Sequence, residues 1–223
     1  PRWVAALELI DRNLTENAPT YFYEIDRDRQ AATSLYLRAF GTFRAATRLA
    51  LSGQAFESTV LVRSILESAV YGWACGRSKV HRDSWEARGD GAQQRKVAKQ
   101  QFKWIDLFAL LEGVDADLAI RIRSLYDECI EYGAHPNVDG VRLRSEVKPL
   151  GNDRYEISTI FIGGEEAVLL SILELTRAME LVYRLLMLTV GDRLRILGVD
   201  EHVEKERLHV LQLIAELEQR GAI

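Results

Sequence analysis

The spacing of the apolar residues is the feature that most constrains how this chain can fold. Apolar side chains recur every three or four residues along most of the sequence, as they do on one face of an α-helix. The clearest such segments cover about 25–51, 55–75, 93–112, 165–190 and 201–219. Four prolines in 223 residues leave little of the chain barred from helix. The pattern predicts a mainly α fold, a bundle of about six or seven helices.

The length and the scarcity of linkers favour one domain. A chain of this size buries roughly 70% of its unfolded surface, which is enough for a core without disulfide or metal support. We therefore predict a single helical-bundle domain over residues 1–223. The first helix is expected to end before Pro19, and the polar segment Arg77–Gly91 is expected to be a connector that contains about one helical turn.

The apolar period changes to two in one place. Apolar or small residues alternate with charged ones from Val141 to Lys148, and Tyr155–Ile162 is rich in β-branched and aromatic residues. Turn-forming residues separate the two runs. We predict a β-hairpin over about 141–162, inserted at about 138–163. An isolated hairpin is marginal in water, so it should pack on the bundle or on a partner chain.

The most hydrophobic stretch, Ala167–Val190, carries Glu174, Arg177, Glu180 and Arg184. Their spacing gathers them into one helical stripe of alternating sign, which can pair along the surface of the helix. A membrane span needs about 20 apolar residues with few or no charges. The stretch is therefore predicted to be an amphipathic helix, with no membrane partner. Its wide apolar face predicts either a central helix or the surface of a homodimer.

The two cysteines bear on the compartment. Cys75 and Cys129 are far apart and lack CxxC spacing. With no signal peptide visible, this usage favours buried, reduced thiols in a cytoplasmic protein.

Arg63 and Glu67 are the first candidate site residues. They lie four apart in a predicted helix, on or beside its apolar face. A buried Arg and Glu must pair, because an isolated buried charge costs several kcal/mol. Two interpretations remain open: a charged element lining an internal cleft, or an intrahelical salt bridge at the edge of the bundle.

A second group of candidates follows Tyr126, where a predicted helix ends at His135, Pro136 and Asn137. A histidine with a pKa near 6.5 suits acid–base chemistry. Arg142 and Arg144 on the polar face of the hairpin could form an anion-binding site with it. Alternatively, His135 and Asn137 cap backbone groups in a loop that ends the helix.

These two motifs carry a family resemblance. Arg63 and Glu67, followed by a helix ending in Tyr126 and then His135-Pro136-Asn137, resemble a group of uncharacterised bacterial helical proteins that are similar to the HEPN superfamily, over about 30–190. Many HEPN proteins are metal-independent ribonucleases with an arginine a few residues before a histidine. Arg195 and His202 match that spacing, although Ile196 stands where the family usually has a polar residue.

The resemblance leaves two functional hypotheses. In the first, the protein is a non-catalytic binding or regulatory module, in a defence or toxin–antitoxin setting. In the second, it is a metal-independent ribonuclease that uses His135 with Arg63, or His202 with Arg195. The candidate catalytic residues are Arg63, Glu67, Tyr126, His135 and Asn137, followed by Arg195 and His202.

A basic segment lies within a chain whose net charge is −4. From Arg77 to Lys103 there are eight Lys or Arg and three acidic residues. Arg95, Lys99 and Lys103 fall on one helical stripe near aromatic residues, a combination that can contact phosphates and stack on unpaired bases. The segment is thus a candidate site for an RNA or protein partner. The alternative is an ordinary solvated helix face.

Neither a metal nor a cofactor is expected. His202, Glu206 and His209 can share one side of the last helix, but a dinuclear bundle site needs a second Glu-x-x-His, which the sequence lacks. Walker A, GxGxxG, GxSxG, HExxH and paired CxxC motifs are also absent from the sequence.

Overall fold

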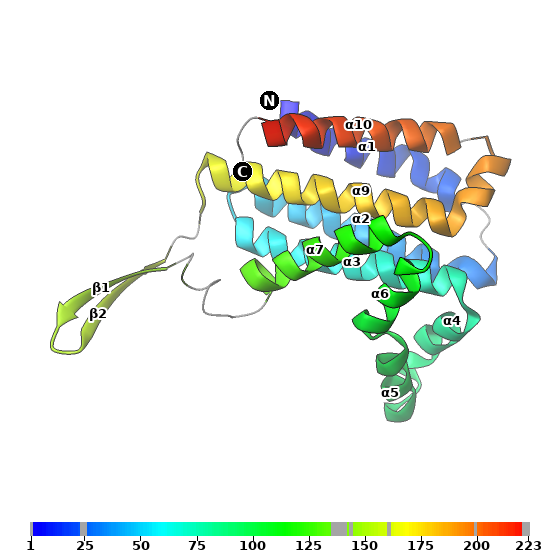
Figure 1. The fold of residues 1–223 in the computed structure, drawn as a ribbon, viewed down its shortest axis with the longest axis horizontal. Helices are drawn as coiled ribbons and strands as arrows, with labels where there is room; N and C mark the ends of the chain where they lie inside the picture. The colour runs from blue at the N-terminus through cyan, green and yellow to red at the C-terminus, as the bar shows by residue number, and fades with distance from the viewer. Residues whose placement is uncertain are drawn as a thin grey trace.

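The computed structural model describes residues 2–22, 26–134, 142, 145–159, 162–198 and 200–219. Over these residues the chain is mainly α-helical with one inserted β-hairpin, which confirms the predicted fold class (Figure 1). The helices are α1 (Arg2–Phe22), α2 (Arg27–Leu51), α3 (Ala55–Arg77), α4 (Lys79–Glu86), α5 (Ala92–Gln101), α6 (Trp104–Glu112), α7 (Ala116–Cys129), α9 (Glu165–Ile196) and α10 (Asp200–Gln219). Shorter elements are a 3-10 turn (Ala87–Gly89), a π-helical turn (Ile130–Ala134) and strands β1 (Ser145–Gly151) and β2 (Arg154–Thr159).

The core lies where α2, α3 and α9 pack together. Each helix buries an apolar face, and Phe43 on α2, Trp73 on α3 and Tyr183 on α9 are at most 1% exposed. A side chain at Gly76 of α3 would collide with Thr189 of α9, so the absence of a Cβ allows these two helices to approach closely. α9 is therefore a central helix, one of the two roles that its wide apolar face predicts.

The charged stripe of α9 does not lie along an open surface, and the prediction that its members pair with one another is wrong. α7 and α10 pack against α9 and supply the partners. Arg184 binds Asp115 of α7 at 2.6 Å, and Arg177 binds Glu218 of α10 at 2.6 Å. Periodicity placed these charges on one face, but it could not show that two further helices cover that face.

Glu180 is the buried member of the stripe, with no exposed surface. Its carboxylate accepts a hydrogen bond from Arg121 Nη2 of α7 at 2.7 Å and from Arg207 Nη1 of α10 at 2.8 Å. Arg207 also donates two hydrogen bonds to Glu204. A buried carboxylate has to be paired in this way, so Glu180 ties α7 and α10 to the central helix.

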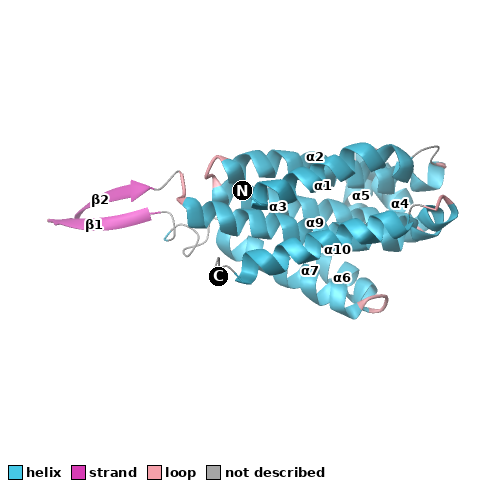
Figure 2. Ribbon diagram, turned by 90° about the horizontal axis from the view of Figure 1, so that it is seen from above, coloured by secondary structure: helices cyan, strands magenta, loops and turns pink. Residues whose placement is uncertain are grey.

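The hairpin extends away from one end of the bundle (Figures 1 and 2). Its strands pair antiparallel, with Val147 opposite Ile157, around a turn where Asn152 and Asp153 adopt positive φ angles. The described strands lie within the predicted 141–162, and residues 141, 143–144 and 160–161 fall outside the described residues. Every side chain from Glu146 to Thr159 is exposed, so the expectation that the hairpin packs on the bundle is wrong for the described strands. Packing on a partner chain remains a prediction.

α1 continues past Pro19 to Phe22, so the prediction that it ends before the proline is wrong. Proline lacks a backbone N–H and costs a helix interior about 3 kcal/mol. Here Tyr21 is only 1% exposed, and the ring of Phe22 lies 6.3 Å from that of Phe40 on α2. Burial of these aromatic side chains offsets the lost hydrogen bond.

α4, α5 and α6 form an arm that stands off the side of the bundle (Figure 1). The segment expected to be a connector contains the two-turn helix α4, whose N-terminus is capped by Ser78. The polar composition did not indicate a helix of this length, because contacts with other parts of the bundle stabilise α4. His81 is nearly buried, and Arg82 forms an ion pair with Asp28 of α2 at 3.1 Å.

Two predictions concern the environment of the chain: the absence of a membrane span and the reduced state of the two cysteines. Among the described residues, no helix combines the length and apolar character that crossing a membrane requires. Cys75 and Cys129 are both buried free thiols, as predicted. Burial raises the pKa of the Cys75 thiol to about 12.

Replacing Glu180 with alanine is expected to lower the free energy of unfolding by about 3 kcal/mol, because Arg121 and Arg207 lose their shared carboxylate. Urea unfolding followed by circular dichroism measures the change. The control is Asp192→Ala, which removes the exposed ion pair with Arg195 and should cost less than about 1 kcal/mol. Equal losses in the two variants would contradict a special role for Glu180.

Candidate functional site

The structure brings Arg63, Glu67 and Tyr126 together. Arg63 and Glu67 lie one turn apart on α3, and Tyr126 faces them from α7. Arg63 Nε donates a hydrogen bond to Glu67 Oε1 at 2.9 Å, and the Tyr126 hydroxyl donates to the same oxygen at 3.3 Å. The Arg63 guanidinium carbon also lies 5.2 Å from the centroid of the Tyr126 ring. One carboxylate thus orients both an arginine and a phenol.

This cluster lies at the edge of the bundle. The side chains of Arg63 and Glu67 are 24% and 31% exposed, whereas Tyr126 is buried. Burial raises the pKa of Tyr126 to about 12; the Arg63 charge opposes the rise and the Glu67 charge adds to it. Tyr126 therefore remains a protonated hydrogen-bond donor at neutral pH. The intrahelical salt bridge is present, and a ligand can still reach both of its members.

Aromatic side chains continue from the cluster into the arm. Trp104 lies 4.2 Å from Tyr126 between ring centroids, and Tyr71 lies 4.7 Å from Phe102. We call this set of rings the aromatic strip; it comprises Tyr71, Trp85, Phe102, Trp104, Phe108 and Tyr126. Tyr71, Trp85, Trp104 and Phe108 are partly exposed. The strip joins α3 and α7 to the arm, and it leaves parts of several rings open to solvent.

An arginine lies at each end of the aromatic strip. Arg63 lies over Tyr126, and the Arg88 guanidinium carbon lies 5.7 Å from the centroid of the Trp85 ring. Sequence reasoning treated Arg63 and Glu67 as one site and the basic segment as another. Tyr71 was the available signal, because the spacing of Arg63, Glu67 and Tyr71 places all three on one face of α3. The spacing could not show where the arm lies relative to α3, because a helical period relates only residues of the same helix.

The predicted basic stripe lies on α5 and just beyond it. Arg95, Lys96, Lys99 and Lys103 are exposed. Within the described part of the chain, none of the four forms an ion pair with an acidic side chain. Two other cations of the segment are paired, Lys79 with Asp83 at 2.6 Å and Arg82 with Asp28 at 3.1 Å. We call Arg95, Lys96, Lys99 and Lys103 the basic face of the arm.

Several candidate residues fall outside the described structure. His135, Asn137 and Arg144 belong to this group, and Arg142 is described only as exposed. The π-helical turn Ile130–Ala134, which precedes His135 in the sequence, packs against α3. A pairing of Arg63 with His135 stays a prediction.

The second arginine–histidine pair is only partly described. Arg195 is exposed near the end of α9 and donates to Asp192 at 3.1 Å. His202 lies in α10, but its side chain is outside the described set. His209 is exposed on the same helix. Over the residues that are described, no three His, Cys, Asp or Glu side chains gather in a way that could hold a metal ion.

Comparison with protein-family models, with curated proteins and with solved structures found no match for this chain. The chemistry of this chain's own side chains is therefore the basis for assigning it a function. The aromatic strip can stack on planar groups, its two arginines can donate hydrogen bonds to anions, and the basic face can attract a polyanion.

Glu174 on α9 is a candidate that sequence reasoning missed, because its place in the charged stripe suggested a solvated side chain. It is partly buried, and Thr59 Oγ1 of α3 donates to its Oε2 at 2.7 Å. Burial raises the pKa of Glu174 to about 7; the hydrogen bond from Thr59 and the charge of Arg177 oppose the rise, and the charge of Glu128 adds to it. This carboxyl therefore changes its protonation near neutral pH.

Stability is expected to fall as the pH rises from about 4.5 to 7, since the folded chain keeps a proton on Glu174 that the unfolded chain releases. The sign follows from the raised pKa: the stabilisation is complete below the unfolded value and is lost as pH rises through the folded value. Glu174→Gln should remove this component, which we put at about 2–3 kcal/mol. Urea unfolding at pH 5 and pH 8 measures it.

The control is Glu112→Gln at an exposed position of α6, which should follow the wild-type pH dependence. If the difference in unfolding free energy between the wild type and Glu174→Gln stays constant from pH 5 to pH 8, Glu174 does not titrate in this range.

Proposed function

We propose that this chain is a non-catalytic RNA-binding module that holds unpaired nucleotides on the aromatic strip and the basic face of the arm. The observation that carries the proposal is the partial exposure of several rings between two arginines. Base–aromatic stacking contributes about 1–3 kcal/mol per base and depends little on sequence, because every base has a π face. Tyr71, Trp85 and Trp104 supply such surfaces.

Charge supports the same partner. The cations of the basic face have no acidic partner among the described residues, so a phosphate backbone can bind them without displacing existing ion pairs. Binding would release condensed counterions from the nucleic acid, which favours association at low salt. With a net charge of −4 over the whole chain, attraction would be directed to this part of the molecule.

Single strands suit the strip better than duplexes do. Rings can stack only on bases that are not already stacked and paired with their neighbours. Glu67 disfavours close approach of a phosphate to the middle of the cluster, but it can accept hydrogen bonds from the N–H edges of a base. A regulatory role in a defence or toxin–antitoxin setting, as the HEPN resemblance implies, is compatible with a module that binds RNA.

A ribonuclease is the second candidate. The observation that favours it is the packing of Ile130–Ala134 against α3, because His135 is the next residue after that turn. Arg63 could then stabilise a phosphate while His135 transfers a proton.

Two classes of variant should weaken RNA binding in different ways. The double variant Arg95→Glu with Lys99→Glu should weaken binding to a labelled single-stranded RNA about tenfold or more and flatten its dependence on salt. Trp85→Leu should weaken binding about tenfold with an unchanged salt dependence, because it removes stacking and no charge. Fluorescence anisotropy over a series of salt concentrations measures both effects.

The charge-matched control is Arg12→Glu with Lys205→Glu, which changes exposed cations on α1 and α10, across the bundle from the arm (Figure 1). Trp85→Phe, which keeps a ring, should retain most of the affinity. Equal weakening by the control pair, or equal binding of a duplex and a single strand, would count against the aromatic strip as the site.

Incubation with RNA separates the two candidate functions. Under the proposal, purified protein leaves RNA intact, and His135→Ala changes nothing in this assay. Cleavage that disappears in His135→Ala and persists in His209→Ala would replace the binding module with the ribonuclease. The melting temperature of His135→Ala shows whether a loss of activity reflects a loss of the fold.

A further inference from the structure

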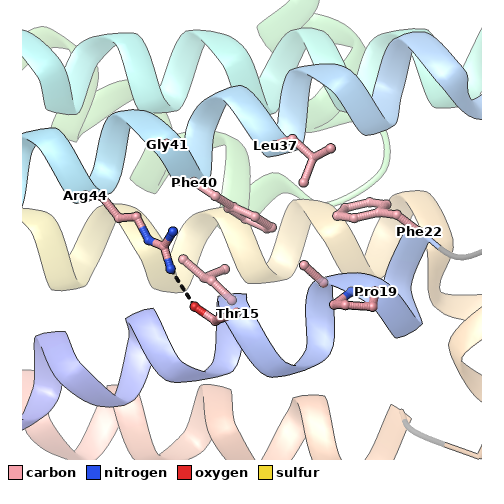
Figure 3. A pocket seen from close by; sticks show the side chains of 9 residues that line it. Thr15, Pro19, Phe22, Leu37, Phe40, Gly41 and Arg44 are labelled. Carbon is pink, nitrogen blue, oxygen red and sulfur yellow. Dashed lines mark hydrogen bonds between the residues drawn. The ribbon is translucent and has the colours of Figure 1, made fainter.

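A pocket between α1 and α2 lies apart from the aromatic strip and from the basic face. Its volume is about 480 Å³, within the range typical of small-molecule sites. Apolar side chains from both helices line most of it, and Figure 3 shows Phe22, Leu37 and Phe40 converging on the hollow. From Leu14 to Phe22 the α1 wall is roughly 12 Å long, given the rise of a helix.

One end of the pocket is polar. Arg44 reaches from α2 to α1, where its Nη2 donates to Thr15 Oγ1 (Figure 3). Its Nε donates to Asp11. The Thr15 hydroxyl in turn donates to the Asp11 carbonyl at 2.7 Å. Nη1 of Arg44 has no hydrogen-bond partner among the described residues. Arg44 is the charged residue that lines this pocket, and because it is ion-paired with Asp11, its polar end offers the Nη1 donor of a paired guanidinium.

The Arg44 bridge divides the seam between the two helices. A second hollow of about 330 Å³ lies on its other side and is lined by Arg44, Arg48 and Asp11 among others. A partner helix running along the seam would collide with the bridge. Two turns of helix also occupy roughly 900 Å³, more than the pocket holds. A narrow molecule that ends at Arg44 avoids both conflicts.

The pocket stays open because two of the residues that line it, Gly41 and Pro19, have no side chain or a compact one. A Cβ at Gly41 would meet no atom within 4 Å, so the α2 wall is open there. Pro19 presents a compact ring on the opposite wall. Arg48, one turn beyond Arg44, is exposed and forms no ion pair among the described residues, and it lines the second hollow together with Glu8 and Asp11.

We propose that this pocket binds a free straight-chain carboxylic acid of medium length. Its hydrocarbon tail lies among Leu14, Phe22, Leu37 and Phe40, and its carboxylate accepts a hydrogen bond from Arg44 Nη1. Tail burial supplies affinity in proportion to the CH₂ groups removed from water. The charge-assisted hydrogen bond supplies the preference for an anionic head. This site is independent of the proposed binding of RNA.

Isothermal titration calorimetry tests the proposal with decanoate and decyltrimethylammonium, each below its critical micelle concentration, and with decanol below its solubility limit. We expect one decanoate per chain, with decanol at least fivefold weaker and the cationic amphiphile weaker still. Arg44→Gln should remove the preference for the acid over the alcohol. Equal affinity of the wild type for all three probes, or several molecules bound per chain, would overturn the proposal.

Gly41→Leu and Ala45→Leu form a matched pair on α2. The first places a side chain in the pocket, and the second places the same side chain at an exposed position that does not line it. Gly41→Leu should weaken decanoate binding at least tenfold without lowering the melting temperature, and Ala45→Leu should leave binding unchanged. Equal effects of the two variants would contradict the site.

Size-exclusion chromatography tests the other occupant. If the seam joined two copies of the chain, Gly41→Leu would change the elution volume, and that result would also overturn the proposal. Binding to vesicles of anionic phospholipid that Gly41→Leu abolishes would assign the pocket to a membrane lipid instead of a free acid.

Discussion

The Glu180 carboxylate is the interaction on which the arrangement of the outer helices depends. It is fully buried on the central helix and is held by Arg121 of α7 and Arg207 of α10. A buried charge is tolerated only when hydrogen-bonding partners replace the water that it loses. Apolar packing alone would allow several rotations of α7 around the core. A carboxylate that must pair with two particular guanidinium groups favours one of these rotations. That rotation of α7 sets the position of Tyr126.

The position of α7 determines the candidate site. Tyr126 meets Arg63 and Glu67 because α7 lies beside α3, and the ring of Trp104 contacts that of Tyr126 because α6 leads into α7. The aromatic strip is therefore both the joint between the arm and the bundle and the surface proposed to bind RNA. A joint of this kind cannot bury all its rings, since the arm touches the bundle along only one side. Its partial exposure follows from the architecture.

Much of the fold follows from local rules, and several failures share one cause. Periodicity located the apolar faces of α2, α3 and α9, and the change of period located the hairpin. Pro19 and the polar segment before α5 gave wrong predictions because residues distant in sequence bury Tyr21 and His81 and pack against Phe22. For the site, spacing indicated Arg63 and Glu67 as a pair. It could not show that Tyr126, 59 residues from Glu67, donates to the same carboxylate oxygen as Arg63, nor that Glu174 is partly buried.

The sequence by itself determined the fold class, because helical and strand periods are properties of neighbouring residues. It also determined which residues carry charge on the arm and which pair lies one turn apart on α3. Only the tertiary structure decided which charges are buried, which rings stay open, and where α1 and α2 leave a pocket beside Gly41 and Arg44. Burial and cavities arise from contacts between distant segments. Such contacts depend on how whole helices pack, and no local pattern encodes that packing.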